Sequence, residues 1–461
     1  FQPPPTPPGI SCPPRDACQH ALAFLPSSPA QVRSTVRHLS RLCEPDARPP
    51  FRPWRGLFGS GVRLPSDQYL WLLWLIAEYA LHYRDRAFID QELPPLPGAT
   101  GRTRTIRDLV HRSLDQVEPA TGRHGLLRSL SDDEGRCLSL PGGPVGRLWA
   151  RARAESVLAS ALAGVARPRV AELCRWLGET ARAQETEQRA AGIRLALAQA
   201  WNGHWFERIV TGNGRPIGRH QLCLECQPWV LLAGAASEAQ RVIVLHEIGQ
   251  RLPLGTREGT GLEALDAVPF SVRAALVCAL AQHDPLAAWE TLKSCTLASH
   301  AEEHPERWFG IWSGPESLAP LARGAPGLLP APGRLADLPI ASGHSASQLL
   351  YALRQLAGLQ ADAQGYRVDL RLPFESFAFE AARLGIRWEP GRVAGHVIPQ
   401  GNDSVLMRVR YRQAFAGRPK VLVNRRRVPA QLSDDGCEVS FQVFLRGGQR
   451  AAWEVTAEPE G

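Results

Sequence analysis

The sequence has no apolar run long enough to cross a bilayer. The apolar stretch 69–81 is too short for this and contains Glu78. The N-terminus shows no signal-peptide pattern, although the chain begins with Phe rather than Met. We therefore expect a cytoplasmic protein that does not insert into a membrane.

Patterns for metal and nucleic-acid binding are also missing. Cys223 and Cys226 form a single CxxC, with no second Cys or His pair at zinc-site spacing, so we expect no metal. The net charge of +8 is spread over isolated arginines, and only Arg425, Arg426 and Arg427 form a dense run. Without a basic stripe interleaved with aromatic residues, we expect no nucleic-acid partner. The ten cysteines are expected to be reduced thiols, because a chain this long needs no disulfides to fold.

Tryptophan, proline and glycine are abundant. The chain has 13 Trp against six Tyr and one Met, and indole faces are surfaces on which sugar rings stack. Core packing is the alternative interpretation of each Trp. The 39 Pro and 41 Gly predict many breaks between elements, and a length of 461 residues allows two or three domains.

The periodicity of the sequence divides the chain into three parts. Residues 1–30 are Pro-rich with little periodic pattern, and we expect a linker or the stump of an earlier domain. Residues 31–362 alternate amphipathic segments with loops rich in Gly and Pro, which predicts a mainly α fold. The expected helical segments are 31–44, 67–83, 103–117, 148–166, 168–200, 228–233 with 237–251, 268–281, 284–295 and 345–358. Residues 363–461 alternate with period two and predict a C-terminal β-sandwich.

Several short strings, taken in order, resemble the catalytic module of family 94 glycoside phosphorylases over residues 56–360. They are Gly61-Val-Arg63 with Ser66-Asp67-Gln68, Thr121-Gly-Arg-His-Gly-Leu126, Trp201-Asn-Gly-His-Trp-Phe206, Leu222-Cys-Leu-Glu-Cys-Gln-Pro-Trp229 and Ser313-Gly-Pro-Glu316. The group includes cellobiose phosphorylase and the phosphorylase-like end of cyclic β-1,2-glucan synthases. The resemblance implies an (α/α)6 six-hairpin toroid, followed by the C-terminal β-sandwich.

The resemblance also implies that part of the family's architecture is missing. Family members carry a long N-terminal β-sandwich, a linker and the first barrel helices before the Gly-Val-Arg segment. This chain has roughly 55 residues in that place. Either the chain is a fragment that lacks the N-terminal domain or the toroid is incomplete, and we expect an open or irregular edge.

The resemblance implies one catalytic carboxylic acid, which protonates the leaving glycosidic oxygen while phosphate attacks the anomeric carbon. In the family this acid ends an Asp-Trp-Asn-Asp motif shortly after the Thr-Gly-x-His-Gly-Leu string. At this place the chain has Asp132, Asp133 and Glu134 and lacks the Trp. Each of the three is a candidate for the acid, and a solvated turn is the alternative.

The resemblance also implies that residues around the Gly-Val-Arg string bind the reacting sugar. Arg63 and Asp67 match sugar-binding residues of the family, whereas Gln68 stands where the family has a second acid. An amide keeps a hydrogen bond to a sugar hydroxyl but loses the strength that a charge adds. The alternative is that Arg63 and Asp67 form a local ion pair that caps the helix starting near Ser66.

Contacts on the leaving-sugar side are implied for the string that holds Glu225, Gln227 and Trp229. Glu225 lies between apolar neighbours, so it needs a partner if it is buried. Either a sugar hydroxyl or an arginine can be that partner. Gln227 and Trp229 are the matching candidates for hydrogen bonding and stacking.

The phosphate-binding pattern of the family is incomplete. Its phosphate His follows a Gly-Gly-aromatic stretch, but the corresponding segment from Gly259 has no histidine. Its Thr-Gly-Thr-Ala string appears as Ser-Gly-His344-Ser345-Ala, in which His344 replaces the hydroxyl. His344 and Ser345 stay candidates for holding an anion. The changes nevertheless argue against phosphorolysis.

We expect an enzyme that cleaves or transfers a glycosidic bond in a β-glucoside-type oligosaccharide by an inverting mechanism, and that is more hydrolase-like than phosphorylase-like. A hydrolase needs a base, for which Glu225, Asp266 and Glu316 are candidates. The alternatives are a phosphorylase that uses inorganic phosphate as co-substrate and a sugar-binding protein that has lost the chemistry. No other cofactor is expected. The expected partners are an oligosaccharide substrate and a second copy of the chain in a homodimer.

Overall fold

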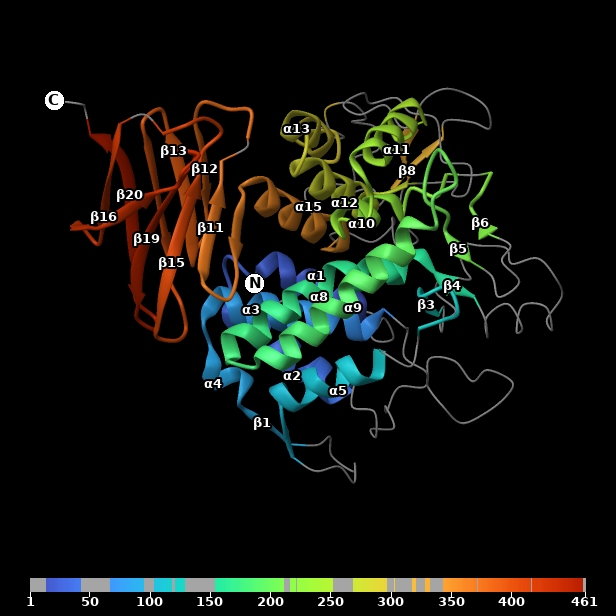
Figure 1. Ribbon diagram of the computed structural model, residues 1–461, viewed down its shortest axis with the longest axis horizontal. Helices are drawn as coiled ribbons and strands as arrows, with labels where there is room; N and C mark the ends of the chain where they lie inside the picture. Colours follow the sequence, from blue (N-terminus) through green and yellow to red (C-terminus); the bar gives the residue numbers. More distant parts are fainter. Residues whose placement is uncertain are drawn as a thin grey trace.

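The computed structural model has a helical part followed by a strand-rich C-terminal part (Figure 1). It describes residues 14–42, 67–94, 103–117, 121–128, 154–210, 216–220, 222–251, 268–296, 302, 317–320, 328–331, 343–370, 372–415 and 417–458. The helices are α1 (Pro14–Phe24), α2 (Pro29–Leu42), α3 (Gln68–Tyr83), α4 (Arg86–Ile89), α5 (Ile106–Val117), α8 (Val157–Leu177), α9 (Thr180–Ala198), α10 (Gln227–Leu232), α11 (Glu238–Arg251), α12 (Phe270–Ala281), α13 (Pro285–Lys293) and α15 (Gly343–Leu356).

Six helices contact one another in a closed circuit. Helix α1 contacts α3, α3 contacts α8, and the circuit continues through α10, α12 and α15, which contacts α1 again. We call these the inner helices. All residues of α3 except Tyr69 are buried, and a helix that is apolar on every side needs neighbours all around it. Helices α2, α5, α9 and α13 pack against the inner helices as a second layer.

Contacts between α3 and α8 show that these helices run in the same direction. The Glu78 carboxylate, in the second half of α3, lies 2.6 Å from Nε of Arg169, in the second half of α8. Arg86, just beyond the end of α3, donates to the carbonyl of Leu177 at the end of α8, at 2.7 Å. Both contacts pair late positions of one helix with late positions of the other.

Helix α15 runs in this direction as well. The Glu78 carboxylate lies 3.2 Å from Nη2 of Arg354, which is close to the end of α15. One turn earlier in each helix, Trp74 packs edge-on against Tyr351, with ring centroids 5.6 Å apart. The starts of α3, α8 and α15 therefore share one side of the circuit, which we call the N-terminal end of the inner helices.

The first inner helix differs from the sequence prediction. Residues 14–24 form α1, although the Pro-rich sequence predicts a linker or stump up to residue 30. Cys18, Ala21, Leu22 and Leu25 recur every three or four residues and are buried, as one face of a helix requires. The prolines around them obscure this periodicity. Because α1 lies between α15 and α3, it occupies the place where an open edge is expected.

The path of α8 also differs from the prediction of a break before Pro168. The helix continues through Pro168 to Leu177 and ends at Gly178, whose φ of 87° is left-handed. An internal proline costs one backbone hydrogen bond. Val170 and Leu173, in the following turn, are fully buried, so their packing holds the helix continuous across this defect.

The C-terminal part contains two sheets. One has the order β10-β11-β15-β19-β18 and the other β12-β13-β14-β20-β16-β17; β11 and β15 pair in parallel and the other neighbours are antiparallel. Their strands are β10 (Leu359–Ala361), β11 (Gly365–Asp369), β12 (Phe377–Glu380), β13 (Leu384–Glu389), β14 (Arg392–Val397), β15 (Asp403–Arg410), β16 (Arg418–Val423), β17 (Arg426–Val428), β18 (Ala430–Leu432), β19 (Glu438–Leu445) and β20 (Ala451–Glu458). Alternate residues of β15 and β19 are buried, and Phe441 of one sheet packs on Trp453 of the other with centroids 6.0 Å apart.

The prediction of a mainly helical part followed by a strand-rich part is confirmed. The (α/α)6 toroid and the β-sandwich, as specific folds, stay predictions, and so do the domain boundaries. Three small sheets lie within the helical part, with the orders β1-β2, β3-β4-β5-β6 and β7-β8-β9. Their strands are β1 (Glu92–Leu93), β2 (Arg104–Thr105), β3 (Leu127–Arg128), β4 (Glu155–Ser156), β5 (Ile209–Val210), β6 (Pro216–Ile217), β7 (Val268–Pro269), β8 (Ser317–Pro320) and β9 (Leu328–Ala331). Among the helices that the structure describes, none is both long enough and apolar enough to cross a membrane.

Arg84 joins the helical part to the strands. It follows the end of α3 in a left-handed conformation, with a φ of 54°, and its side chain is fully buried. Its guanidinium donates to the carbonyls of Asp362 and Gly365 at 2.6 and 2.7 Å. The hydroxyl of Tyr366 in β11 donates to the carbonyl of His82 at 2.5 Å. The end of α3 is thereby held against the first strands of the C-terminal part.

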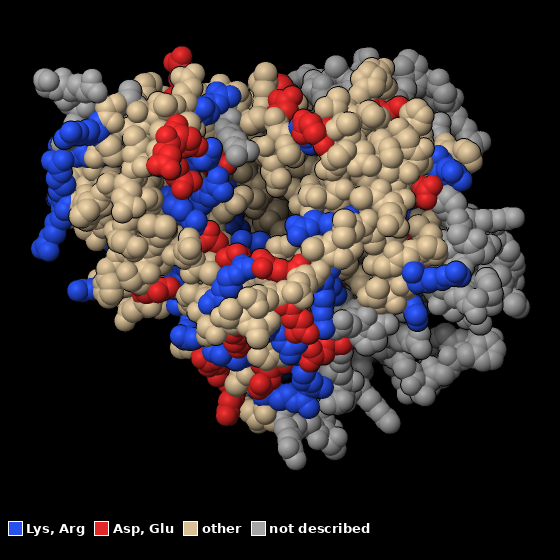
Figure 2. Space-filling view, viewed as in Figure 1, with Lys and Arg blue, Asp and Glu red and all other residues tan. Residues whose placement is uncertain are grey.

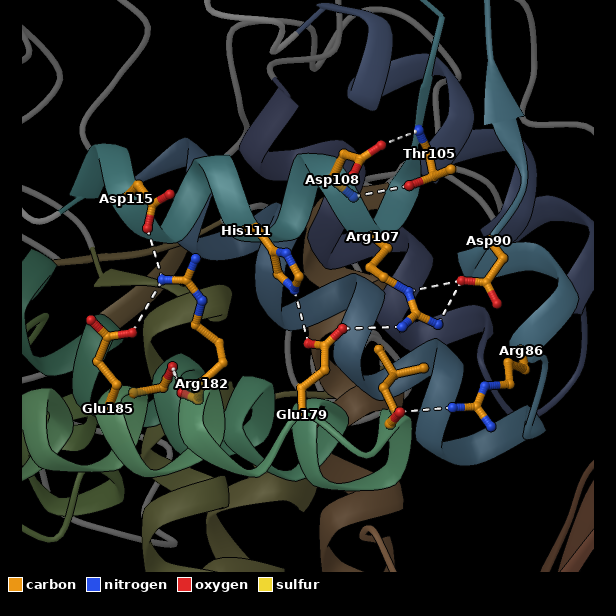
Figure 3. A network of polar contacts seen from close by, with 12 residues as sticks. Arg86, Asp90, Thr105, Arg107, Asp108, His111, Asp115, Glu179, Arg182 and Glu185 are labelled. Atoms are coloured by element: carbon orange, nitrogen blue, oxygen red, sulfur yellow. Dashed lines mark hydrogen bonds and ion pairs between the residues drawn. The ribbon is translucent and has the colours of Figure 1, made fainter.

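A polar network holds the second layer together (Figure 3). The carboxylate of Glu179, at the start of α9, accepts from Arg107 at 3.1 Å and contacts Nε2 of His111 at 2.8 Å. Arg107 also binds the carboxylate of Asp90, at the end of α4, at 2.6 Å. Helices α4, α5 and α9, which are far apart in the sequence, are therefore linked through one carboxylate and one guanidinium.

Candidate functional site

Several residues predicted for the site lie at the N-terminal end of the inner helices. Asp67 and Gln68 stand at the start of α3, and Glu225 and Gln227 stand at the start of α10. His344 lies in the first turn of α15. The starts of α3 and α15 lie there because these helices run in the same direction, and the start of α10 lies there through a contact of Glu225 described below. The fold thus gathers strings that are up to 277 residues apart in the sequence on one side of the circuit.

Asp67 and Gln68 have different surroundings. The Asp67 carboxylate lies 3.5 Å from Nη1 of Arg15 in α1 and makes no side-chain bond to the backbone of α3. Gln68 is almost completely buried, with 1% of its surface exposed. The ion pair of Asp67 joins two neighbouring inner helices at their shared end, in addition to any contact with Arg63.

Glu225 has an arginine partner. Its carboxylate lies 3.3 Å from Nη2 of Arg208, whose side chain is only 3% exposed, while that of Glu225 is 30% exposed. Nη1 of Arg208 in turn donates to Oγ of Ser156 at 3.4 Å, and Ser156 caps the start of α8. Of the two partners that the sequence allows for Glu225, the structure shows an arginine, Arg208. One part of the carboxylate still faces solvent, where a sugar hydroxyl could reach it.

The side-chain amide of Gln227 is hydrogen-bonded to the backbone of neighbouring segments. Its side chain is fully buried; Oε1 accepts from the backbone N–H of Phe206 at 3.0 Å, and Nε2 donates to the carbonyls of Phe206 and Cys223 at 2.8 and 3.1 Å. The amide thereby joins the loop before α10 to the 201–206 string. Burial raises the pKa of the Cys226 thiol beside it, so this thiol stays protonated at neutral pH. The structure describes no cluster of His, Cys, Asp and Glu able to hold a metal.

Glu155, which the sequence reading missed, organises the loop before the predicted acid. Its carboxylate is 2% exposed and accepts from the backbone N–H groups of His124 and Leu126, each at 3.1 Å. It also contacts Nδ1 of His124 at 2.9 Å. A Cβ on Gly122 would lie 2.2 Å from the Glu155 side chain, so only glycine fits there. The sequence signal that could have identified Glu155 is a single carboxylate just before the long apolar helix α8.

The remaining predicted residues cannot be placed in full. Arg63, Asp132, Asp133 and Glu134 lie outside the described residues. For His344 and Ser345 the structure describes the helix but not the side chains. Their roles, and the roles of the other predicted site residues, stay predictions.

A pocket of about 340 Å³ lies between the inner helices. Its aromatic wall consists of Trp71, Trp74, Trp229 and Tyr351, whose rings pack against one another with centroids 5.3 to 5.9 Å apart. Trp229, a predicted stacking residue, therefore faces this pocket. Figure 2 shows the surface hollowed between the helices and the C-terminal strands, with basic side chains along the edge of the hollow.

The polar side of the pocket is built around Glu78. This carboxylate, 7% exposed, pairs with both Arg169 and Arg354, and the indole of Trp74 donates to it at 3.4 Å. Burial raises the pKa of Glu78, but the two guanidinium groups lower it more, so that it falls to about 2. Glu78 is therefore ionised at any pH near neutrality and has no proton to give to a leaving group.

Residues 59–272 match the model of the glycosyl hydrolase 94 superfamily, catalytic domain. Over this segment the chain is similar to family 94. It is 27% identical over 195 residues to an N,N'-diacetylchitobiose phosphorylase of Vibrio proteolyticus, covering 41% of this chain and 23% of that protein. It is 29% identical over 181 residues to the protein of that name from Vibrio furnissii, covering 38% of this chain and 21% of that protein. The matches thus span less than a quarter of each relative's length.

Among solved structures, the family 94-like chain is similar to a GH78 family rhamnosidase of Bacillus sp. GL1. The TM-score is 0.50 at 14% identity, covering 83% of this chain and 36% of the rhamnosidase. Similarity at this identity concerns the fold alone.

The family match has a boundary that bears on the site. It includes the starts of α3 and α10, with Asp67, Gln68 and Glu225, and the segment of the predicted acid. It ends at residue 272, before α15. The assignment of His344 and Ser345 to anion binding therefore depends on the sequence string alone.

Proposed function

We propose that this family 94-like protein cleaves or transfers a glycosidic bond of a β-linked oligosaccharide by a single inverting displacement, at the N-terminal end of the inner helices. The observation that carries the proposal is the shared direction of α3, α8 and α15, because it brings the matched strings to one end. The matches to the family model and to two chitobiose phosphorylases support the reaction class. The closed circuit of six inner helices supports an (α/α)6 toroid, with a C-terminal β-sandwich behind it.

In this proposal one residue among Asp132, Asp133 and Glu134 is the general acid. It donates its proton to the glycosidic oxygen as the bond from that oxygen to the anomeric carbon breaks. The cluster begins four residues after Arg128 of β3, and β3 pairs with β4, which carries Glu155. Glu155 therefore lies on the strand that pairs with β3, and β3 leads into the acid segment.

The nucleophile is phosphate or water. The relatives are phosphorylases, which favours phosphate as much as the missing histidine near Gly259 favours water. Phosphate would attack the anomeric carbon and leave as part of a sugar 1-phosphate. Water would need a base to take its proton, with Glu225, Asp266 and Glu316 as candidates. The backbone N–H groups at the starts of the inner helices favour an anion at this end, which suits phosphate.

The test is a set of disaccharide incubations with and without inorganic phosphate. The substrates are N,N'-diacetylchitobiose and glucose disaccharides with β-1,2, β-1,3 and β-1,4 linkages. Sugar 1-phosphate that forms only with phosphate identifies a phosphorylase, and free sugar in both conditions identifies a hydrolase. Calorimetry with the same sugars tests the third alternative, in which the protein binds sugar without cleaving it.

Variants assign the acid. We expect the combined substitution Asp132→Asn, Asp133→Asn and Glu134→Gln to lower the activity at least a hundredfold. Asp434→Asn is the matched control, because Asp434 lies in a similar Ser-Asp-Asp-Gly string in an exposed turn of the C-terminal part. Unchanged activity in the triple variant contradicts the assignment.

A further inference from the structure

The polar side of the pocket lies away from the N-terminal end of the inner helices. Glu78 comes ten residues after Gln68 in α3, which is roughly 15 Å along a helix that rises 1.5 Å per residue. Gln360 of β10 also lines the pocket, and β10 follows the end of α15. We call this part of the cavity, around Glu78, Arg169 and Arg354, the Glu78 pocket.

Arg354 is the first indication that the Glu78 pocket receives a ligand. Its side chain is 1% exposed, and only Nη2 has a partner, the carboxylate of Glu78. Nε and Nη1 are buried without a hydrogen-bond partner in the part of the chain that the structure describes. Two unpaired donors of a buried guanidinium cost free energy unless a ligand or water accepts from them. Arg354 is also one of the residues that line the pocket.

The charge balance favours an anion. Arg169, Arg194 and Arg354 line the pocket, and Glu78 is its one lining carboxylate among the described residues. Arg169 uses its Nε for Glu78 and its Nη2 for the carbonyl of Ala361. Arg194 makes no ion pair with any residue that the structure describes. An excess of two positive charges remains, in a setting where guanidinium groups bind carboxylate and phosphate oxygens well.

The other walls suit a sugar ring. Four glutamine side chains, which both donate and accept hydrogen bonds, line the pocket: Gln282, Gln348, Gln355 and Gln360. The aromatic wall described above adds indoles, whose flat apolar faces suit a sugar ring. A volume of about 340 Å³ is at the small end of ligand pockets and fits a molecule of monosaccharide size.

We propose that the Glu78 pocket binds a monosaccharide that carries one phosphate or carboxylate group. The anionic group accepts from Arg354 and Arg194, the hydroxyls bond the glutamine amides, and the ring packs on the indoles. This is a binding site and not a second catalytic centre, because it needs no proton transfer from Glu78. Its three defining charged residues lie deeper along the inner helices than the residues proposed at the N-terminal end. Of the predicted site residues that the structure describes, only Trp229 lines the pocket. The site would remain if the protein had no enzymatic activity.

The test is isothermal titration calorimetry on the full chain. The probes are glucose 1-phosphate, glucose 6-phosphate and glucuronate, with glucose and inorganic phosphate as the neutral and the sugar-free arms. We expect at least one of the anionic sugars to bind at least tenfold more tightly than glucose and than inorganic phosphate. Comparison of the phosphate and glucuronate arms identifies the anionic group. Equal binding of glucose, or binding of inorganic phosphate alone, overturns the proposal.

Two variants locate the binding without removing the buried ion pairs. Arg194→Gln takes away one charge, and Ala275→Leu fills space in the pocket from α12. We expect each to weaken binding of the anionic sugar at least tenfold. Arg189→Gln and Ala191→Leu are the matched controls, because both residues lie on α9 and neither lines the pocket. Binding that survives both pocket variants overturns the proposal.

A further variant separates this site from the proposed catalytic end. The triple substitution at Asp132, Asp133 and Glu134 should leave the affinity for the anionic sugar unchanged, whether or not it abolishes activity. A tenfold loss of affinity in this variant, with none in Arg194→Gln, places the ligand at the N-terminal end and contradicts the inference. Loss of activity without loss of binding leaves the Glu78 pocket supported.

Discussion

Replacing Glu78 by glutamine removes the one negative charge that faces the buried guanidinium of Arg354 and the half-buried guanidinium of Arg169. The amide of Gln is close to the carboxylate in size, so the substitution changes the charge and little else. Arg169 and Arg354 are then left with positive charges that have lost their counter-ion. We expect Glu78→Gln to destabilise the helical part strongly.

The magnitude follows from two independent considerations. The pKa of Glu78 is lowered from 4.5 to about 2; at about 1.4 kcal/mol per pKa unit this corresponds to roughly 3 kcal/mol. Removing one partner of a buried ion pair typically costs about 3–5 kcal/mol. We therefore expect the free energy of unfolding at pH 7 to fall by about 3–5 kcal/mol.

The pH dependence provides a second measure of this contribution. Because the folded pKa is below the unfolded value of 4.5, the stabilisation is fully present above pH 4.5 and is lost as the pH falls toward 2. The wild-type protein should lose about 3 kcal/mol from this group over that interval. The Gln variant has no carboxylate there, so this component of its acid sensitivity should be absent.

Urea unfolding followed by tryptophan fluorescence is a suitable assay, because Trp74 donates to Glu78 and Trp71 packs against Trp74. Glu290→Gln is the control: Glu290 pairs with Lys293 at 2.8 Å, but both side chains are largely exposed, so its loss should cost less than about 1 kcal/mol. A Glu78→Gln variant within about 1 kcal/mol of wild type at pH 7, with parallel acid unfolding of the two proteins, would refute the reasoning.

Three smaller changes test other parts of the fold, and each is measured by urea unfolding with hydrogen exchange as the local probe. Glu155→Ala leaves two backbone N–H groups of the 121–126 loop without an acceptor and should cost about 2–4 kcal/mol, with faster exchange in that loop and little change elsewhere. Gly122→Ala forces a Cβ into the Glu155 side chain and should lower the free energy of unfolding by about 1–3 kcal/mol. The control is Gly192→Ala, in open space on α9, which should stabilise the protein by about 0.5–1 kcal/mol. Equal effects of the two substitutions would contradict the contact between Gly122 and Glu155. Glu179→Gln weakens the bond to Arg107 and should cost about 1 kcal/mol, an effect that high salt should reduce.

The sequence predicts those parts of the fold whose signals are local. Period-two alternation identified the strands β15 and β19, and apolar periodicity identified most of the helices that the structure describes. Two misassignments have a shared origin in proline, whereas a third, the single helix predicted over 168–200, overlooks the break at Gly178 between α8 and α9. Prolines obscured α1, and Pro168 indicated a break where packing keeps α8 continuous. In both places buried contacts outweigh a local preference of the backbone.

The Glu78 pocket could not be predicted from local patterns. In the sequence, Glu78 only interrupts an apolar stretch. Its partners Arg169 and Arg354 are 91 and 276 residues further along the chain, so no spacing rule connects them. Local patterns are equally insufficient for the neighbouring residues Glu225 and Gln227. One string predicts sugar contacts for both, but only the packed structure reveals that the amide of Gln227 is taken up by the backbone of Phe206.

The shared direction of α3, α8 and α15 gives the two ends of the circuit different electrostatics. Unpaired backbone N–H groups and helix dipoles favour negative charge at the N-terminal end. That field helps a phosphate nucleophile but lowers the pKa of any carboxylic acid placed there. An acid among Asp132, Asp133 and Glu134 therefore needs apolar cover or a neighbouring carboxylate to keep its proton.

At the other end, arginines at the Glu78 pocket provide a second place for an anion. Phosphate could then change the rate in two ways, as a nucleophile at the N-terminal end or as a ligand of the pocket. Ala275→Leu separates them, because Ala275 lines the pocket and lies in the second turn of α12 rather than at the start of a helix. A phosphate effect on activity that survives this substitution arises at the N-terminal end, and one that disappears with it arises at the Glu78 pocket.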